Sequence, residues 1–471
     1  LSAFDLVSVD SSGQQGDRPS FDPSLSADGN RIVFLSQSQL APQDTDTYTD
    51  VYLHDRTTAE TTLVSIGTNG SSADRFCSSP MISADGNHVV FASSASNLVT
   101  GITVTQLNVF HRNLTTGTTT LISKDTMNQE GNASSGSPSI SANGSRIVFN
   151  SSASNLLSGG GGFSQIYLWE NGNFERVSKD QMGADANGDC FEPEISSDGG
   201  YVVFTALATN LHDGPADTNN ATDIIWKKLA NNKVGRISIS SNLVESNGDS
   251  RFPRISTNGR FVTFWSRASN LLGAMGDTNN LDDIFVHDVE NTLTTLVTVD
   301  EVGNPVPPTN LITPVVGSWI SGDGEKILFV TSGLQPIVGN QIPRAALYEY
   351  NRNLGTSRMI DRTFDGREPN GDVKVYDVGI SLDGNVIAYA SDATDISYSD
   401  TNANVPDVFV MPGTPRTGTV DPFAALRARL AKKMQKLKRR AKAARRNGQS
   451  DRGRRLMVKV RKLTKRIRSL S

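Results

Sequence analysis

The chain has 471 residues, of which 37% are hydrophobic and 20% charged, and its formal net charge at pH 7 is −4. No apolar run approaches the roughly 18 residues that indicate a membrane-spanning helix, so we expect no such helix. The two cysteines, Cys77 and Cys190, are too few for a disulfide framework or a four-ligand zinc site; we expect free thiols, with pairing between chains as the alternative.

The small net charge hides a sharp division along the chain. Residues 421–471 hold 20 of the 45 lysines and arginines but two of the 49 acidic residues, which gives this segment a net charge of +18. The other 25 basic and 47 acidic residues leave a net charge of −22 on residues 1–420. Such an asymmetry is typical of a chain that carries an interaction segment at one end.

After a first predicted strand at residues 4–10, one sequence phrase occurs seven times. Its first copy is Pro23-Ser-Leu-Ser-Ala-Asp28-Gly29, followed by an apolar stretch at 31–34. Asp-Gly or Asn-Gly between two apolar stretches favours a tight hairpin, because both central positions of the preferred turn require a positive φ. The turn glycines, spaced 55 to 65 residues apart, are Gly29, Gly86, Gly144, Gly199, Gly259, Gly324 and Gly384.

Each repeat continues with two more predicted strands, so each predicts a four-stranded antiparallel unit. In the first repeat these strands lie at 50–55 and 62–65. Seven such units indicate a seven-bladed β-propeller. The seventh repeat lacks a fourth strand after residues 407–411, and we expect the strand at 4–10 to supply it and to close the ring.

The phrase Pro-x-Ile-Ser-x-Asp-Gly, followed by a strand that ends in Phe, resembles the repeat of TolB-like propellers of bacterial envelope and secreted proteins. The resemblance covers residues 4–411. It implies an extracellular or cell-surface bacterial protein, with the periplasm as the alternative. That family includes envelope scaffolds, binding proteins, some lyases and propellers fused to peptidases. This chain departs from TolB itself, which has six repeats and no comparable basic segment.

Four repeats carry an aspartate-rich loop between their second and third predicted strands. Oxygen ligands at alternate positions, followed by a further carboxylate, can surround Ca²⁺, and apart from Ca²⁺ we expect no cofactor. The alternative is structural, with an Asx turn in each loop and the last aspartate capping the next strand. The candidate ligands are Asp44, Asp46 and Asp50; Asp217, Asn219 and Asp223; Asp277, Asn279 and Asp283; and Asp400, Asn402 and Asp407.

No catalytic motif stands out in the sequence. It contains no Gly-x-Ser-x-Gly elbow, no phosphate-binding Gly-x-x-x-x-Gly-Lys loop and no His-Glu-x-x-His pair. His54 and His287 each precede an aspartate at the same place in two repeats. Repeat symmetry favours the interpretation that both are exposed strand residues. We therefore predict that the chain is not an enzyme, and we assign no catalytic residue.

From residue 421 the apolar residues recur at three- and four-residue steps, which is typical of helices. Asp421-Pro422 is a good helix start, and Asn447-Gly448 separates two such stretches. We predict a propeller at 1–411, a linker at 412–420 and a basic α-helical hairpin at 421–471. The predicted interaction residues are Phe423, Leu426, Leu430, Met434, Leu437, Arg439, Arg440, Arg445, Arg446, Arg454, Arg455, Leu456, Val460, Leu463 and Ile467.

These features predict a non-catalytic extracellular propeller whose basic C-terminal part docks on acidic surfaces. The acidic surface expected first is the propeller of a neighbouring copy, and a head-to-tail contact of this kind produces rings or filaments. Two alternatives stay open: an adhesion or glycan-binding protein anchored to anionic cell-surface polymers, and a propeller-type polysaccharide lyase. Because no aromatic residue follows Phe423, we do not expect binding of nucleic acid by base stacking.

Overall fold

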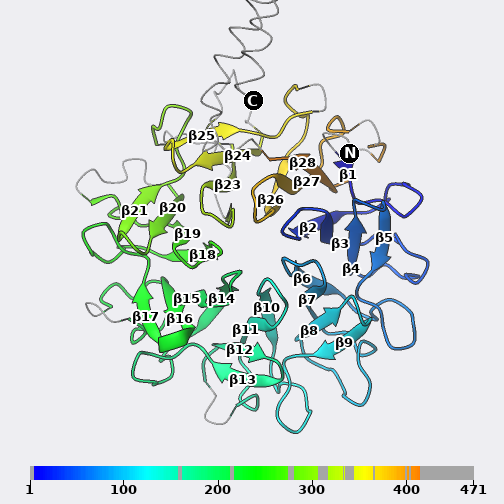
Figure 1. The fold of residues 1–471 in the computed structure, drawn as a ribbon, viewed down its shortest axis with the longest axis horizontal. Helices are drawn as coiled ribbons and strands as arrows, with labels where there is room; N and C mark the ends of the chain where they lie inside the picture. The colour runs from blue at the N-terminus through cyan, green and yellow to red at the C-terminus, as the bar shows by residue number, and fades with distance from the viewer. Residues whose placement is uncertain are drawn as a thin grey trace, which may run out of the picture. The chain divides into compact units, whose positions relative to one another are not determined.

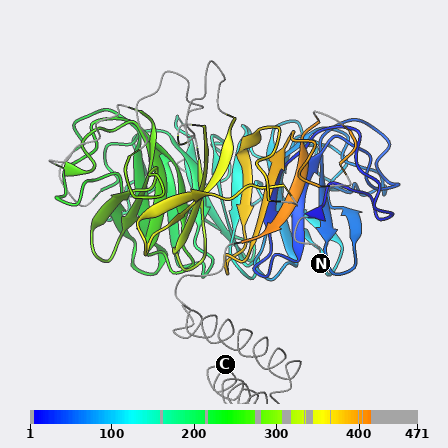
Figure 2. The same ribbon diagram turned by 90° about the horizontal axis from the view of Figure 1, so that it is seen from above.

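The computed structural model describes residues 5–157, 162–212, 217–273, 281–305, 317–332, 334, 344–363, 366–397, 400–402 and 405–413. These residues form seven four-stranded antiparallel sheets arranged as blades around a central channel (Figure 1). Seen edge-on, the blades form one disc (Figure 2). The predicted seven-bladed β-propeller is confirmed.

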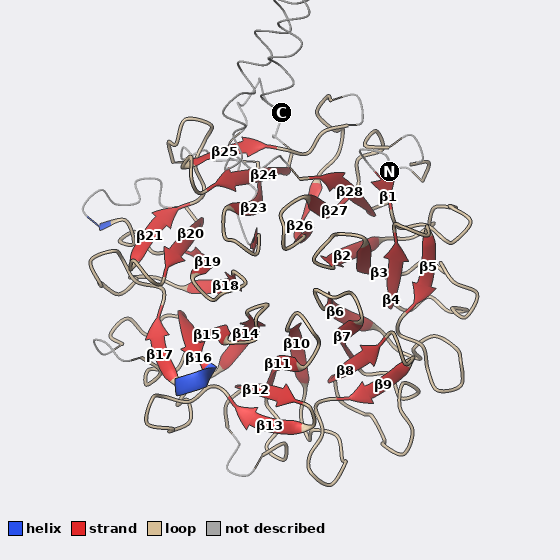
Figure 3. Ribbon diagram, viewed as in Figure 1, coloured by secondary structure: helices blue, strands red, loops and turns tan. Residues whose placement is uncertain are grey.

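Each blade contributes four strands, which follow one another outward from the channel (Figure 3). Blade 1 contains β2 (Ser20–Leu25), β3 (Arg31–Ser36), β4 (Asp50–Asp55) and β5 (Glu60–Leu63), and blade 2 contains β6 (Cys77–Ile82), β7 (His88–Ser93), β8 (Asn108–Asn113) and β9 (Thr118–Leu121). Blade 3 contains β10 (Ser135–Ile140), β11 (Arg146–Ser151), β12 (Gln165–Glu170) and β13 (Asn173–Arg176), and blade 4 contains β14 (Cys190–Ile195), β15 (Tyr201–Ala206), β16 (Asp223–Lys228) and β17 (Lys233–Arg236). Blade 5 contains β18 (Ser250–Ile255), β19 (Phe261–Ser266), β20 (Asp283–Asp288) and β21 (Leu293–Leu296), and blade 6 contains β22 (Ser318–Ile320), β23 (Lys326–Thr331), β24 (Ala346–Asn351) and β25 (Thr356–Met359). Blade 7 contains β26 (Val373–Ile380), β27 (Val386–Ser391), β28 (Asp407–Pro412) and β1 (Asp5–Leu6).

The first strand of the chain closes the ring, as the sequence predicts. β1 pairs antiparallel with β28, with Leu6 opposite Phe409. The pairing continues past β1, because the backbone N–H of Val7 donates to the carbonyl of Val408 over 3.0 Å. The Ser8 hydroxyl then donates to the buried Asp407 carboxylate over 2.6 Å. The last blade is therefore completed by residues about 400 positions away in sequence, and β28 is not left as an open sheet edge.

The predicted C-terminal α-helical hairpin is wrong as a part of the fold class. The part of the chain that the structure describes contains no α-helix, and its 3-10 helix η1 (Leu229–Asn231) is a single turn. None of its helices is long and apolar enough to cross a membrane. Apolar spacing alone does not secure a helix pair whose other faces are basic, because like charges four residues apart repel and isolated short helices are marginal. Residues 414–471, a separate unit of the chain, lie outside the described residues.

The core lies between the blades and rests on a repeated pair of aromatic side chains. In six of the blades an aromatic residue of the second strand, such as Phe34, lies opposite an aromatic residue of the third strand, such as Tyr52. Their ring centroids are 6.0 Å apart and the rings are stacked, and both side chains are fully buried. Equivalent pairs occur in five further blades: Phe91 and Phe110, Phe149 and Tyr167, Phe264 and Phe285, Phe329 and Tyr348, and Tyr389 and Phe409.

Both cysteines belong to this core. Cys77 and Cys190 are free thiols, as predicted, with 2% and 0% of their surfaces exposed. Burial raises the pKa of each thiol far above its usual value. Neither sulfur is accessible to a second chain in this structure, which argues against the alternative of pairing between chains.

The turn glycines position neighbouring blades against each other. At Gly259, φ is +72°, and a Cβ atom there would lie 2.3 Å from the ring of Tyr201, the first residue of β15 in blade 4. In every blade the side chain nearest to the turn glycine belongs to the first residue of the preceding blade's second strand. These covering residues are Val386, Arg31, His88, Arg146, Tyr201, Phe261 and Lys326.

The contact at Gly259 can be separated from the conformational demand of the turn by a matched pair of substitutions. Gly183 also has a positive φ (+93°), but no atom lies within 4 Å of the position of its Cβ. We expect Gly183→Ala to lower the free energy of unfolding by about 1–2 kcal/mol through the left-handed backbone alone. Gly259→Ala should cost about 1–3 kcal/mol more because of overpacking against Tyr201. Chemical denaturation of the two variants measures the difference, and equal losses would contradict the packing role of the turn.

Candidate functional site

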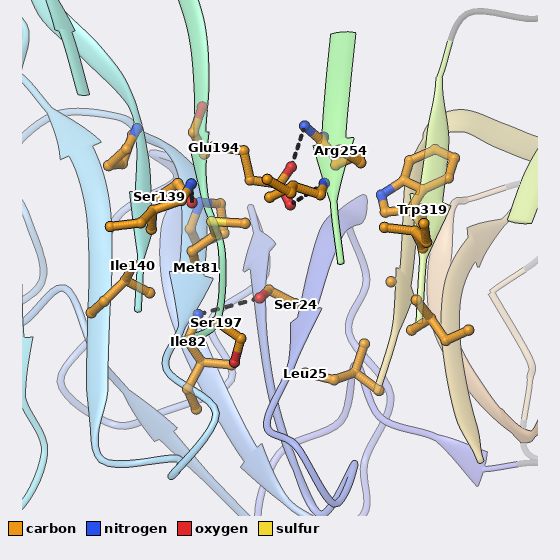
Figure 4. A pocket seen from close by; sticks show the side chains of 18 of the residues that line it. Ser24, Leu25, Met81, Ile82, Ser139, Ile140, Glu194, Ser197, Arg254 and Trp319 are labelled. Atoms are coloured by element: carbon orange, nitrogen blue, oxygen red, sulfur yellow. Dashed lines mark hydrogen bonds and ion pairs between the residues drawn. The ribbon is translucent and has the colours of Figure 1, made fainter. Parts of the chain in front are cut away.

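The innermost strands of all seven blades line one cavity along the channel, with a volume of about 380 Å³ (Figure 4). In four of the junctions between blades, a side chain of one innermost strand accepts a backbone N–H of the next; the bond from Asp22 to Asp377 at the junction of blades 7 and 1 is described below. Ser24 accepts the N–H of Ile82, Ser139 accepts that of Ile195, and Glu194 accepts that of Ile255, over 3.2 to 3.3 Å. These bonds fix the wall of the channel.

A β-bulge in the innermost strand aims side chains into the cavity. In blade 1, Phe21 pairs with Leu35 and Ser24 pairs with Val33. Two residues of the innermost strand, Asp22 and Pro23, therefore lie opposite the single residue Phe34. Asp22 has a φ of +53°, an unusual conformation for a residue other than glycine, which costs on the order of 1–3 kcal/mol and is often found at functional sites. The five left-handed residues of this kind, each followed by proline, are Asp22, Ser79, Ser137, Glu192 and Phe252.

The repeated proline is a signal for this bulge that the pattern of turns and apolar stretches does not reveal. Proline has no N–H to offer to a sheet and is tolerated within strands at bulges, so the residue before the repeated proline is the one that turns. The sixth and seventh repeats have no proline in this place. Their equivalent residues are not among the left-handed ones that the structure describes.

Acidic residues gather where the bulges meet. The Asp22 N–H donates to the Asp377 carboxylate over 3.1 Å. Asp22 lines the cavity, and Asp377 lies next in sequence to Tyr376, which lines it too. Burial, together with the neighbouring Asp377 charge and against the opposing effect of Arg254, raises the pKa of Asp22 to about 7. Burial also raises the pKa of Asp377 and of Glu194. Arg254 forms an ion pair with Glu194 over 3.3 Å.

Aromatic side chains stand beside these acids. Phe252 packs edge-on against Trp265 and Tyr376, with centroid distances of 6.4 and 6.0 Å. Tyr376 is 56% exposed although it is a large ring. Trp319 lines the same cavity from β22 (Figure 4). Carboxylates beside ring faces suit a cationic group that carries an apolar stem, such as a lysine or arginine side chain.

The structure brings three of the predicted loop residues together in blade 1. Carboxylate oxygens of Asp44, Asp46 and Asp50 lie within 4.8 Å of one another. Burial, together with the charges of Asp44 and Asp46, raises the pKa of Asp50 to about 8. The loop also forms the turns of the structural alternative, because Asp44 accepts the N–H of Asp46, and Asp46 accepts that of Tyr48.

The equivalent loop in blade 4 contains an internal cation. Asp217, Asp223 and Glu245 also bring carboxylate oxygens within 4.8 Å of one another. However, Arg236 from β17 forms ion pairs with both Asp223 and Glu245. Asn219 joins the loop to blade 5 by donating to the carbonyl of Ser246 over 2.6 Å.

The remaining two loops are described in part. In blade 7, the side-chain amide of Gln15 donates to Asp400 and to Asp407 over 2.9 and 2.7 Å. Asn402 donates to the carbonyl of Gly16 over 2.9 Å. In blade 5, Asp283 is buried and accepts the Thr298 hydroxyl. Asp277 and Asn279 lie outside the described residues, as do all the predicted interaction residues of the segment 421–471.

None of the five histidines lines the cavity. The interpretation of His54 and His287 as exposed residues is wrong, because both are buried and their Nδ1 atoms lie 2.9 Å from the hydroxyls of Thr61 and Thr294. Burial lowers the pKa of His287 to about 4. His88 and His111 bond each other over 3.0 Å, and His212 lies near the carbonyl of Thr209. The described residues therefore assemble no histidine cluster at the channel.

No protein-family model matches the chain, and no curated protein matches it in sequence. Among solved structures, it is similar to a prolyl endopeptidase (12% identity, TM-score 0.50), with 85% of this chain and 50% of that chain covered. It is also similar to a putative TolB from Agrobacterium tumefaciens (17% identity, TM-score 0.38, 59% and 80% covered) and to an oligogalacturonate lyase from Vibrio parahaemolyticus (14% identity, TM-score 0.49, 88% and 98% covered). At these identities the likeness concerns the fold alone, a β-propeller of the kind that the predicted TolB-like resemblance implies.

The raised pKa of Asp22 leads to a pH-dependent stability. The unfolded chain releases the Asp22 proton near pH 4, whereas the folded chain retains it until about pH 7, so raising the pH between these values favours unfolding. Asparagine tolerates the left-handed backbone at this position. We expect Asp22→Asn to reduce the loss of unfolding free energy between pH 4.5 and 7.5 by about 1–3 kcal/mol, as measured by urea denaturation.

Asp28, in the turn of the same blade, provides the matched control. Its hydrogen bonds to Ser26 and Asn30 outweigh the effect of burial and lower its pKa, so it titrates below this pH window in both states. Asp28→Asn should leave the loss between pH 4.5 and 7.5 nearly unchanged. The interpretation of Asp22 would be refuted by an Asp22→Asn variant that loses as much stability over this window as the unmodified protein.

Proposed function

We propose that this chain is a non-catalytic binding propeller that acts outside the cytoplasm. Copies of it assemble when the basic C-terminal segment of one, residues 421–471, docks on the propeller of the next. The docking site is the acidic part of the channel around Asp22, Glu192 and Asp377, here called the acidic channel mouth. The observation that carries the proposal is the acidic and aromatic composition of this mouth. Asp22, Glu192 and the exposed Tyr376 line the cavity, and the Asp377 carboxylate accepts the N–H of Asp22. Arg254 is already paired with Glu194.

Charge complementarity supports the choice of partner. The net charge of +18 on residues 421–471 meets a net charge of −22 on the rest of the chain. Opposite charges of this size accelerate association and make it sensitive to salt. A contact between one end of a copy and the propeller of the next is heterologous, so it generates rings or open filaments.

The size of the cavity limits what can enter it. A volume of about 380 Å³ is at the low end for ligand pockets and fits a few side chains rather than a folded domain. Arginine and lysine side chains have apolar stems that can lie against Phe252 and Tyr376, while their charged ends reach the carboxylates of Asp22 and Asp377. We therefore expect the cavity to recognise basic side chains.

The location outside the cytoplasm is proposed from the sequence. The repeat resembles that of envelope and secreted propellers, and the acidic mouth gives no reason for a partner within the cytoplasm. A binding role in place of catalysis is supported by the dispersal of the histidines away from the channel.

The association is tested by light scattering coupled to size-exclusion chromatography. The full chain should form concentration-dependent assemblies at low salt that dissociate at about 1 M salt, where the Debye length is about 3 Å. A shortened chain that ends at Val420 retains every described strand and should be monomeric. Asp22→Asn combined with Asp377→Asn should raise the concentration needed for assembly about tenfold or more.

A pair of exposed acids away from the mouth provides the charge-matched control. Asp17→Asn combined with Glu301→Gln removes the same charge from surface loops and should leave assembly unchanged. If the full chain stays monomeric at low salt and high concentration, the proposal is wrong. The basic segment would then be tested against anionic cell-surface polymers.

A further inference from the structure

A buried carboxylate begins the third strand in several blades, and its hydrogen-bond partners differ from blade to blade. In blades 1, 4 and 7 these residues are Asp50, Asp223 and Asp407, each at most 2% exposed. One oxygen of each accepts a serine hydroxyl, from Ser65, Ser238 and Ser8, over 2.5 to 2.6 Å. The second oxygen is where the blades differ.

In blades 4 and 7 a donor from the same chain reaches the second oxygen. The Arg236 guanidinium lies 3.3 Å from Oδ2 of Asp223 and also pairs with Glu245. The Gln15 amide donates to Oδ2 of Asp407 over 2.7 Å and also bonds Asp400. Each loop therefore contains its own hydrogen-bond donor for the carboxylates it gathers.

Blade 1 lacks both of these donors. Arg236 of blade 4 pairs with Ile225, which lies two residues after Asp223. The equivalent residue of blade 1, Tyr52, pairs with Leu63, so a leucine stands where blade 4 has the arginine. Gln15, which serves blade 7, forms an isolated β-bridge with Val9, and the equivalent bridge beside blade 1 joins Ile66 and Ser72. Ser72 therefore stands where blade 7 has the glutamine. The Ser72 hydroxyl donates to Asp46 over 3.0 Å and not to Asp50.

The result is a buried carboxylate oxygen without a partner inside an acidic cluster. Asp50 is 0% exposed, and no donor reaches its Oδ2 in hydrogen-bond geometry, although the backbone N–H of Ala73 interacts with the Asp50 carboxylate. Oxygens of Asp44 and Asp46 lie within 4.8 Å of an Asp50 oxygen. Among the described residues, no lysine or arginine forms an ion pair with any of the three. An unpaired buried charge costs several kcal/mol unless a counter-ion compensates it or the group takes up a proton.

We propose that Asp44, Asp46 and Asp50 of blade 1 form a Ca²⁺ site, and that the equivalent clusters of blades 4 and 7 have replaced the ion with Arg236 and Gln15. Ca²⁺ takes oxygen ligands at 2.3–2.6 Å in flexible geometry, so two ligand oxygens on opposite sides of one ion lie roughly 5 Å apart. The spacing within the cluster fits this. Asp44 is 3% exposed and is oriented by the Tyr52 hydroxyl, which holds one ligand in place.

The test uses the full chain, stripped with a chelator, and Ca²⁺ alone as the probe. Calorimetry should find one ion per chain, and Ca²⁺ should raise the melting temperature, because an ion that binds only the folded state stabilises it. Asp46→Asn, at a partly exposed position, should weaken Ca²⁺ binding about tenfold or more. The matched control, Asp217→Asn in blade 4, should leave binding unchanged.

A reciprocal substitution keeps the proposal falsifiable if Asp46→Asn proves unstable. Leu63→Arg gives blade 1 the guanidinium of blade 4, and it should fold with a melting temperature that no longer responds to Ca²⁺. Terbium offers a local readout, because excitation of Tyr48 or Tyr52 should sensitise a bound Tb³⁺ in the unmodified chain and not in Asp46→Asn.

Three outcomes would overturn the proposal: no binding of Ca²⁺ by the unmodified chain, binding that survives Asp46→Asn but not Asp217→Asn, or Mg²⁺ binding as tight as Ca²⁺ binding. These outcomes are independent of the proposed assembly, which does not involve this loop.

Discussion

In six successive junctions around the ring, the inner turn of one blade is hydrogen-bonded through its backbone to the inner turn of the next. Ala27 donates to Ala84 over 2.9 Å, and Gly322 donates to Leu382 over the same distance. At the seventh junction, the side chain of Val386 covers the turn glycine Gly29. These turns meet closely, and at Gly29, Gly144, Gly259 and Gly324 a Cβ atom would lie less than 3 Å from a side chain of the preceding blade. The spacing of the blades is therefore fixed at one end of the channel. The bulges further along the same strands then determine which side chains enter the cavity.

Much of the fold could be predicted from sequence because the information is local and repeated. Asp-Gly and Asn-Gly turns and the apolar stretches beside them have a physical meaning within a single hairpin. The missing fourth strand of the last blade is a long-range signal, which the repeat pattern makes visible at the other end of the chain. The helical hairpin has no support in the described residues, which do not include 421–471; a period of three to four records apolar spacing only and not the repulsion among basic faces. Burial of His54 and His287 was missed because repeat symmetry locates a residue in a blade but does not give its exposure.

The loops illustrate why site chemistry was harder to predict than the fold. The loops of blades 1, 4 and 7 begin and end with the same residue type, but what distinguishes them comes from elsewhere in the chain. Arg236 lies in the fourth strand of its blade, and Gln15 reaches blade 7 from the start of the chain. Once the repeats are aligned, Leu63 opposite Tyr52 could have marked blade 1 as the loop without an internal donor. A buried carboxylate satisfied by its own chain supports the fold, whereas one left unsatisfied points to a ligand.

The central claim, that basic side chains of one copy dock at the acidic channel mouth of another, is tested most directly by zero-length carbodiimide cross-linking. A mixture of unlabelled and ¹⁵N-labelled full chain distinguishes links between copies from links within one. We predict mixed-isotope links that join lysines of residues 421–471 to Asp22 or Asp377 and that disappear at high salt. Links confined to single chains, or links between copies that avoid these two aspartates, would contradict the claim.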